Sequence, residues 1–121
     1  MELLDFVSQE SVILTTFKKD GTPVPTVVWI AQNQDYLIVA TNINAGKVKR
    51  VRDDSFVILC GTNRNGTEKI TKNYKAKGCE VTNEEDKISG INAIRSKYGV
   101  TGETLTQGPM GNRSIIKISN R

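Results

Sequence analysis

The chain has 121 residues, of which 37% are hydrophobic and 25% charged, with a formal net charge of +4. These values are typical of an ordinary globular protein, and we expect residues 1–121 to form a single domain. No segment approaches the ~20 consecutive apolar residues of a membrane-spanning helix. The first ten residues carry acids where a secretory signal would carry bases. We therefore expect a cytoplasmic protein without a membrane partner.

The amino-acid composition excludes several kinds of active site. Histidine is absent, which removes Ser–His–Asp and Cys–His catalysis and metal sites built on imidazole. The two cysteines, Cys60 and Cys79, follow apolar, strand-like segments, and we expect both thiols to be buried and reduced. No metal site is predicted, and any catalysis would depend on a bound cofactor.

The positive charge is spread along the chain, with acidic residues between the basic ones. Nucleic-acid-binding proteins usually concentrate their basic residues and place aromatic residues among them. Only seven aromatic residues are present (three Phe, three Tyr and one Trp). This distribution favours a compact anion such as a phosphate group, and no nucleic-acid partner is expected.

The first half of the chain predicts a short helix followed by three strands. Residues 1–9 have apolar residues at helical spacing, and residues 11–19 are a β-branched apolar segment that ends at the Asp20–Gly21 turn signal. Residues 24–32 form the second strand of this hairpin, and residues 36–42 form the third strand. Trp29 is expected to pack on the face opposite Val28.

The second half predicts two helices and three more strands. Residues 45–54 form a basic helix that Asn42 or Asn44 can cap. Residues 55–62 are apolar on both faces, as expected for a central strand, and residues 69–82 alternate like a long strand. An amphipathic helix over 83–100 precedes the Gly-rich segment 106–112, which is either a lid over a ligand or a simple connection, and a last strand over 113–119. Hairpin connections dominate, so the pattern predicts a mainly β, antiparallel barrel of six strands with helices outside.

The basic helix poses the main functional question, because Lys47 falls in its first turn. A lysine there is unfavourable against the helix dipole unless an anion offsets its charge. Lys47 is therefore either a phosphate ligand or a solvated surface residue. Arg50 shares the Lys47 face of the helix better than Lys49 does. Thr15 and Thr16 either line this site from the first strand or are ordinary strand threonines.

Three features in register, over residues 11–60, resemble one known family. They are the DGTP hairpin, the apolar strand TVVW at 26–29, and the pattern T-N-x-x-x-G-K at 41–47. This region is similar to the FMN-binding split-barrel family that includes pyridoxamine 5′-phosphate oxidase, and most similar to its small branch of coenzyme F420-dependent and flavin-dependent oxidoreductases. The resemblance implies a split barrel.

The resemblance also implies roles for individual residues. Main-chain groups of the strand would bind the flavin ring, and the residues near the basic helix would bind the ribityl chain and the phosphate. The implied cofactor-binding residues are Thr26, Val27, Val28, Thr41, Asn42, Ala45, Gly46, Lys47 and Arg50. The chain departs from the oxidases themselves: it has Pro25, Ile30 and Gly46–Lys47 where they have basic residues or an Arg–Lys pair. Oxidation of pyridoxamine phosphate is therefore not expected.

The expected function is hydride transfer to or from a small organic substrate, with FMN or the deazaflavin coenzyme F420 as the cofactor. No catalytic residue can be named. A barrel of this size has too little interior for a flavin, so we expect a homodimer with the cofactor in the subunit interface. The alternatives are a non-catalytic flavin-binding or flavin-storage protein and a basic module that binds anions.

Overall fold

The fold is described from a computed structural model of the chain, over residues 2–9, 11–42, 45–63, 67–105 and 113–121. In chain order the elements are the 3₁₀ helix η1 (Leu3–Ser8), β1 (Ser11–Phe17), β2 (Pro23–Val28), β3 (Ile30–Asn33), β4 (Tyr36–Asn42), α1 (Gly46–Asp53), β5 (Phe56–Thr62), β6 (Tyr74–Val81), α2 (Glu84–Leu105) and β7 (Arg113–Ser119). Among these residues, no helix is both long enough and apolar enough to span a bilayer.

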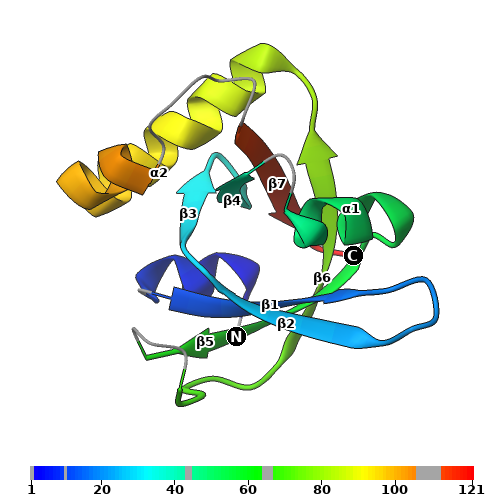
Figure 1. Cartoon of the computed structure of the whole chain (residues 1–121). Coiled ribbons are helices and arrows are strands. Elements are labelled where there is room, and N and C mark those ends of the chain that lie inside the picture. The colour runs from blue at the N-terminus through cyan, green and yellow to red at the C-terminus, as the bar shows by residue number, and fades with distance from the viewer. Residues whose placement is uncertain (1, 10, 43–44, 64–66, 106–112) are drawn as a thin grey trace.

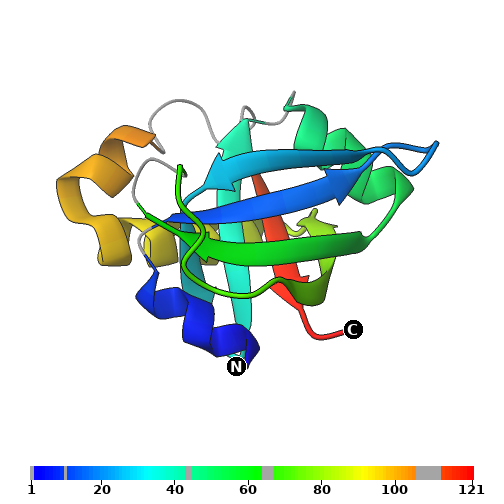
Figure 2. The same cartoon turned by 90° about the horizontal axis from the view of Figure 1, so that it is seen from below.

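The strands form one antiparallel sheet in the order β2-β1-β5-β6-β7-β4-β3. The sheet curls into a half-barrel, with α2 and α1 at opposite ends of the molecule (Figures 1 and 2). The predicted mainly β, antiparallel split barrel is therefore confirmed. As predicted, β5 is an inner strand, paired with β1 on one side and β6 on the other.

The sheet has seven strands, whereas the sequence pattern predicts six. The predicted strand over 24–32 is two strands, because the chain changes partner at Trp29: β2 pairs with β1, and β3 pairs with β4. The strand predicted over 69–82 begins only at Tyr74. Before it, among the described residues, Lys69 makes an isolated bridge to Thr62.

Two apolar clusters hold the sheet and the helices together. The first fills the half-barrel with side chains from η1, α1 and all seven strands, including Phe6, Leu14, Val48, Val51 and Leu59. Because these side chains are buried against one another, the inside of the barrel has no room for a flavin ring. Any cofactor must therefore bind on the outside of the sheet.

The second cluster packs α2 on the outer face of the sheet through Ile91 and Ile94, which meet Ile115. Near the end of this contact, the Tyr98 ring stacks on Trp29, with 4.3 Å between ring centroids. Trp29 therefore has the packing role that the sequence predicts. Beyond the predicted end at residue 100, α2 continues to Leu105 after a break at Gly99, whose φ of 61° and ψ of −133° are not helical.

The capping residue and one cysteine differ from the predictions. The N-cap of α1 is Ala45, without a side-chain cap hydrogen bond. Asn42 belongs to β4, where it pairs with Arg113, and Asn44 lies outside the described residues, as does the predicted lid at 106–112. Cys60 is buried, but the prediction is wrong for Cys79, which is exposed. Its neighbour Gly78 takes the buried position in the alternation of β6.

Candidate functional site

The helix α1 has a fixed orientation because its two valines, Val48 and Val51, are buried in the half-barrel. Residues three and four positions apart share a face of a helix. Gly46, Lys49, Arg50 and Asp53 therefore lie together on the side of α1 that faces away from the core. Lys47 and Arg52 lie on the two flanks between that side and the valines.

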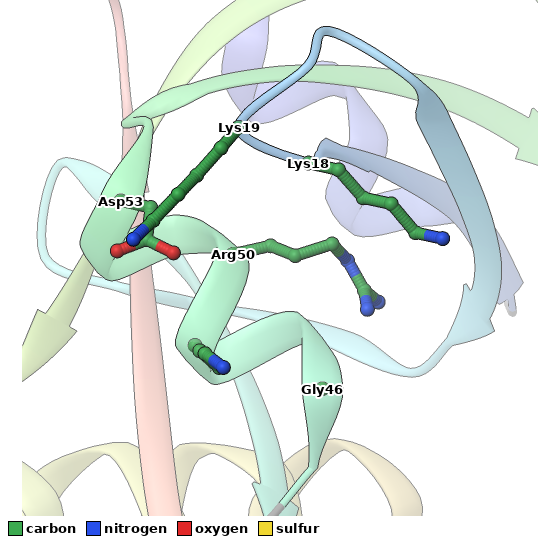
Figure 3. A pocket seen from close by; sticks show the side chains of 6 residues that line it. Lys18, Lys19, Gly46, Arg50 and Asp53 are labelled. Carbon is green, nitrogen blue, oxygen red and sulfur yellow. The ribbon is translucent and has the colours of Figure 1, made fainter.

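The outward side of α1 faces the turn of the β1–β2 hairpin, and a cavity of about 330 Å³ lies between them. Its lining residues are Lys18, Lys19, Gly46, Lys49, Arg50 and Asp53. We call this cavity the basic pocket. Figure 3 shows Lys18 and Arg50 extending into the space between the hairpin and the helix, while Lys19 extends toward the part of α1 that carries Asp53. Four cationic side chains and one carboxylate line the pocket, which favours an anionic ligand.

Arg50 is held in place by the end of β1. Its Nε donates a hydrogen bond of 2.6 Å to Oγ1 of Thr16, whose side chain is fully buried. This bond directs the guanidinium over Gly46, where a Cβ atom would lie only 2.7 Å from Nη1 of Arg50. The guanidinium is thus fixed beside the first turn of α1, where the main-chain N–H groups attract anions. The sequence suggests that Thr15 and Thr16 could line the site. Thr16 contributes to it indirectly, because its hydroxyl positions Arg50.

Lys47 has an electrostatic environment that disfavours its own charge. Burial lowers the pKa of the Lys47 ammonium below its ordinary value, and the positive charge of Arg50 lowers it further. Two cations close together and partly removed from water are stabilised by an anion that neutralises them. Lys47 does not line the basic pocket. It lies on the neighbouring flank of α1, so Arg50 stands between Lys47 and the pocket lysines.

The opposite flank of α1 is anchored by Arg52. Its Nε and Nη2 donate hydrogen bonds of 2.8 and 2.7 Å to the two carboxylate oxygens of Glu80 on β6. The fully buried Ser114 on β7 donates a third bond, of 3.2 Å, to the same carboxylate. The hydrogen bonds from Arg52 are the main reason why the pKa of Glu80 is lowered. Arg50 and Arg52 thus tie α1 to β1 and to β6, which holds the first turn in one place.

The structure brings only part of the predicted site together. Within the described residues, Gly46 and Arg50 are the predicted residues that line the basic pocket. Val28 is 5% exposed, so its side chain belongs to the core, whereas Val27 is 44% exposed on the outer face. Thr41 lies in β4, opposite Ser114 of β7. Ala45 is partly buried against the core as the N-cap residue.

Four charged residues of the basic pocket are absent from the predicted set. Lys18 and Lys19 come from the hairpin turn, which the Asp20–Gly21 signal did locate, but no sequence pattern says which helix a turn will face. Lys49 and Asp53 follow Gly46 at the spacing of one helix face. Once Val48 and Val51 are assigned to the core, this spacing identifies them as outward residues.

A second cavity lies on the outer face of β2, β1 and β5. Its volume is about 470 Å³, and its lining residues are Ile13, Thr15, Phe17, Pro23, Pro25, Ile58, Cys60, Lys69 and Asn73. Strand register places Val27 beside Ile13, Pro23 beside Phe17 and Ile58 beside Thr15 on this face. We call Ile13, Phe17, Pro23, Pro25, Val27 and Ile58 the apolar face.

Replacement of Gly46 by alanine tests whether Arg50 must lie over Gly46. The new Cβ would meet the end of a flexible side chain rather than the backbone, so the guanidinium can move aside and the fold should persist. Alanine also has the higher helix propensity, so the free energy of unfolding should change by less than about 1 kcal/mol. Anion affinity should nevertheless fall about tenfold, because a displaced guanidinium loses a charge-assisted hydrogen bond. Chemical denaturation and phosphate titration measure the two effects. A variant that binds anions normally would show that the position of Arg50 is unimportant.

Comparison with known proteins identifies the fold. The heme storage protein of Vibrio cholerae superposes with a TM-score of 0.76 at 15% identity, over 100% of this chain and 92% of its own. An F420 reductase superposes with a TM-score of 0.67 at 16% identity, over 100% of this chain and 94% of its own. A 5-nitroimidazole antibiotic resistance protein of Bacteroides thetaiotaomicron superposes with a TM-score of 0.69 at 12% identity, over 93% of this chain and 74% of its own. At these identities the likeness shows the fold alone, which serves proteins of different functions.

No curated protein matches the chain significantly in sequence. The family model described as pyridoxamine 5′-phosphate oxidase, however, matches residues 2–120. The match extends well beyond residues 11–60, where the sequence resemblance is strongest, and includes β6, α2 and β7. The chain therefore belongs to the pyridoxamine 5′-phosphate oxidase family.

Proposed function

We propose that the protein is an oxidoreductase that uses FMN or the deazaflavin coenzyme F420 to transfer a hydride to or from a small organic substrate. One observation carries the proposal: Lys47 and Arg50 lie on neighbouring turns at the start of a helix that is fixed to the barrel, where burial and the charge of Arg50 lower the pKa of Lys47. A phosphate would relieve this repulsion. The family membership and the superposition with an F420 reductase support this choice of cofactor class.

The residues of the chain fit the phosphate end of such a cofactor. Lys47 and Arg50 supply two cations, and Gly46 and its neighbours supply main-chain N–H groups at the start of α1. Ala45 is small, and Gly46 leaves room for the Arg50 guanidinium beside these N–H groups. Thr41 and Asn42 are the last two residues of β4, the strand that leads into this region, and they are the proposed neighbours of the ribityl chain.

The residues also fit the ring end, because β2 lies at the edge of the sheet. An edge strand has a row of main-chain N–H and C=O groups that point away from its only neighbour. Successive residues of a strand point these groups to opposite sides, so among Thr26, Val27 and Val28 every second residue can use them to bind the polar edge of a flavin or deazaflavin ring. Pro25 has no N–H group, so acceptors dominate at the start of this edge.

The bound ring would supply the hydride chemistry, and the chain would supply binding, orientation and exclusion of water. No His is present, and Cys60 is buried, so neither is proposed as a proton donor. The second candidate function is binding without catalysis, which the superposition with a heme storage protein favours.

We propose that the cofactor lies between two copies of the chain. The apolar face supports this proposal, because monomers seldom expose large contiguous apolar patches. Val27, at 44% exposure, lies on this face and on the same strand as the proposed ring-binding groups. A second chain seated there would cover both the apolar side chains and one side of the ring.

The function is tested by reconstitution. The purified protein would be freed of any chromophore and titrated with riboflavin, FMN and coenzyme F420, and the loaded forms assayed with activated alkenes and quinones. We expect FMN or F420 to bind far more tightly than riboflavin, which lacks a phosphate, and only the loaded protein to turn over an acceptor. Tight binding without turnover of any acceptor would favour the storage function. Equal affinity for riboflavin and FMN would refute the phosphate site.

A further inference from the structure

We propose that the basic pocket binds a second anionic group of the ligand, joined to the phosphate that Lys47 and Arg50 hold. This inference rests on the proposed function for the position of the first phosphate. It assigns Lys18, Lys19 and Lys49 to a subsite that favours ligands with a diphosphate or a carboxylate-bearing tail over a simple monophosphate.

The size and charge of the basic pocket exceed what one phosphate needs. Its volume of about 330 Å³ is at the low end of the roughly 300–1,000 Å³ of small-molecule sites. A water molecule, in comparison, takes about 30 Å³. The four cationic side chains and one carboxylate give the lining a net charge of +3, without counting Lys47. A single phosphate dianion at Lys47 and Arg50 would leave most of this charge unbalanced.

The geometry separates two anion positions and joins them through Arg50. Lys47 lies on a flank of α1, whereas Lys49 lies on the side that faces the hairpin. Arg50 follows Lys47 by three positions on α1, so the two side chains are neighbours on the helix surface, and Arg50 also lines the basic pocket. Its Nε is bonded to Thr16, which leaves the two terminal nitrogens of the guanidinium for ligands on either side. One ligand with two linked anionic groups can therefore span the Arg50 side chain.

The hairpin wall of the pocket is ordered by its own hydrogen bonds. The N–H of Gly21 donates to the carbonyl of Lys18 at 2.9 Å, and the N–H of Lys18 donates to the carbonyl of Thr22 at 3.0 Å. The N–H of Thr22 also donates to the Asp20 carboxylate at 2.9 Å, and Gly21 has the positive φ of 88° that the turn requires. A turn fixed in this way presents Lys18 and Lys19 to α1 before any ligand arrives, so little ordering cost opposes binding.

The first experiment compares the affinities of three ligands for the full chain. FMN carries one phosphate, FAD a diphosphate, and coenzyme F420 a phosphodiester with carboxylates, so the last two distinguish the possible sources of the second anionic group. We expect at least one of them to bind about five- to twentyfold more tightly than FMN, since each exposed lysine contributes modestly. The double variant Lys18→Ala/Lys19→Ala should lose this preference.

A control variant and a second probe keep the inference separate from the proposed function. Lys72→Ala/Lys117→Ala removes the same charge from exposed positions outside the basic pocket and should keep the preference. The second probe is amide NMR at Gly46 and Lys49 during titration with inorganic pyrophosphate or phosphate. Pyrophosphate should bind more tightly, and only the Lys18/Lys19 variant should remove the difference.

The outcomes can be told apart. If FMN binds but neither larger ligand is preferred, or if the control variant loses the preference equally, the second subsite is refuted while the proposed function stands. If no flavin or deazaflavin binds, the proposed function fails, and the pyrophosphate titration decides the subsite alone. If phosphate and pyrophosphate then change the amide chemical shifts of Gly46 and Lys49 equally, the second subsite is refuted.

Discussion

Replacement of Lys47 by methionine is expected to weaken binding of FMN or coenzyme F420 by about 1.5–3 kcal/mol, the range for a lost charge-assisted hydrogen bond. This corresponds to a loss of affinity of roughly ten- to hundredfold. Methionine keeps the apolar stem of the side chain and removes only the ammonium group. Fluorescence titration with both cofactors measures the loss.

The same substitution should leave the ligand-free protein at least as stable as the wild type. Burial and Arg50 lower the pKa of Lys47 in the folded state below its ordinary value of 10.5. Between these two pKa values the unfolded chain holds more protons than the folded one, so wild-type stability rises with pH across this alkaline window. Below the window, the charged lysine destabilises the fold by a constant amount. Methionine removes that cost, and the variant should lack the part of the alkaline rise in stability that the Lys47 ammonium causes.

Lys72→Met is the matched control, because Lys72 is exposed and lies outside the basic pocket. It should leave cofactor affinity unchanged. A Lys47→Met protein that binds both cofactors like the wild type would exclude Lys47 as a phosphate ligand. A variant that loses stability instead would show that the ammonium group stabilises the ligand-free fold.

The fold could be predicted from local patterns because each strand and helix carries its own signal. Apolar alternation, the Asp20–Gly21 turn and the spacing of Val48 and Val51 locate most of the elements within a few residues. The division of residues 24–32 into β2 and β3 has no such signal. Apolar alternation continues through Trp29, and only tertiary pairing makes the chain leave β1 and join β4.

The candidate site was less predictable because it depends on which elements meet. Gly46, Lys47 and Arg50 are close in sequence, so helix geometry alone places them near one another. Lys18 and Lys19 reach the same region from a hairpin nearly thirty residues away. The wrong prediction for Cys79 has a similar cause. Its apolar sequence neighbours suggest a buried side chain, but its exposure depends on which residues of β6 face the barrel, and Gly78 rather than Cys79 does so.

The apolar face yields the prediction with the largest effect, since Val27→Asp should abolish both dimerisation and cofactor binding. In a two-fold dimer each substitution occurs twice, and each buried carboxylate without a partner costs about 3–5 kcal/mol. The affinity between subunits should therefore fall by more than about a thousandfold. Sedimentation at micromolar concentration should give about twice 13.4 kDa for the wild type and 13.4 kDa for the variant.

Ile88→Asp is the matched control for Val27→Asp. Ile88 on α2 is 43% exposed and Val27 is 44% exposed, but α2 lies at the end of the half-barrel away from the β1–β2 hairpin (Figure 2). Both aspartates remain solvated in a monomer, so neither should unfold it, which circular dichroism would verify. Only Val27→Asp should separate the subunits. If both variants remain dimeric, the apolar face is not the interface. If monomeric Val27→Asp binds the cofactor as tightly as the wild type, one chain is sufficient to form the site.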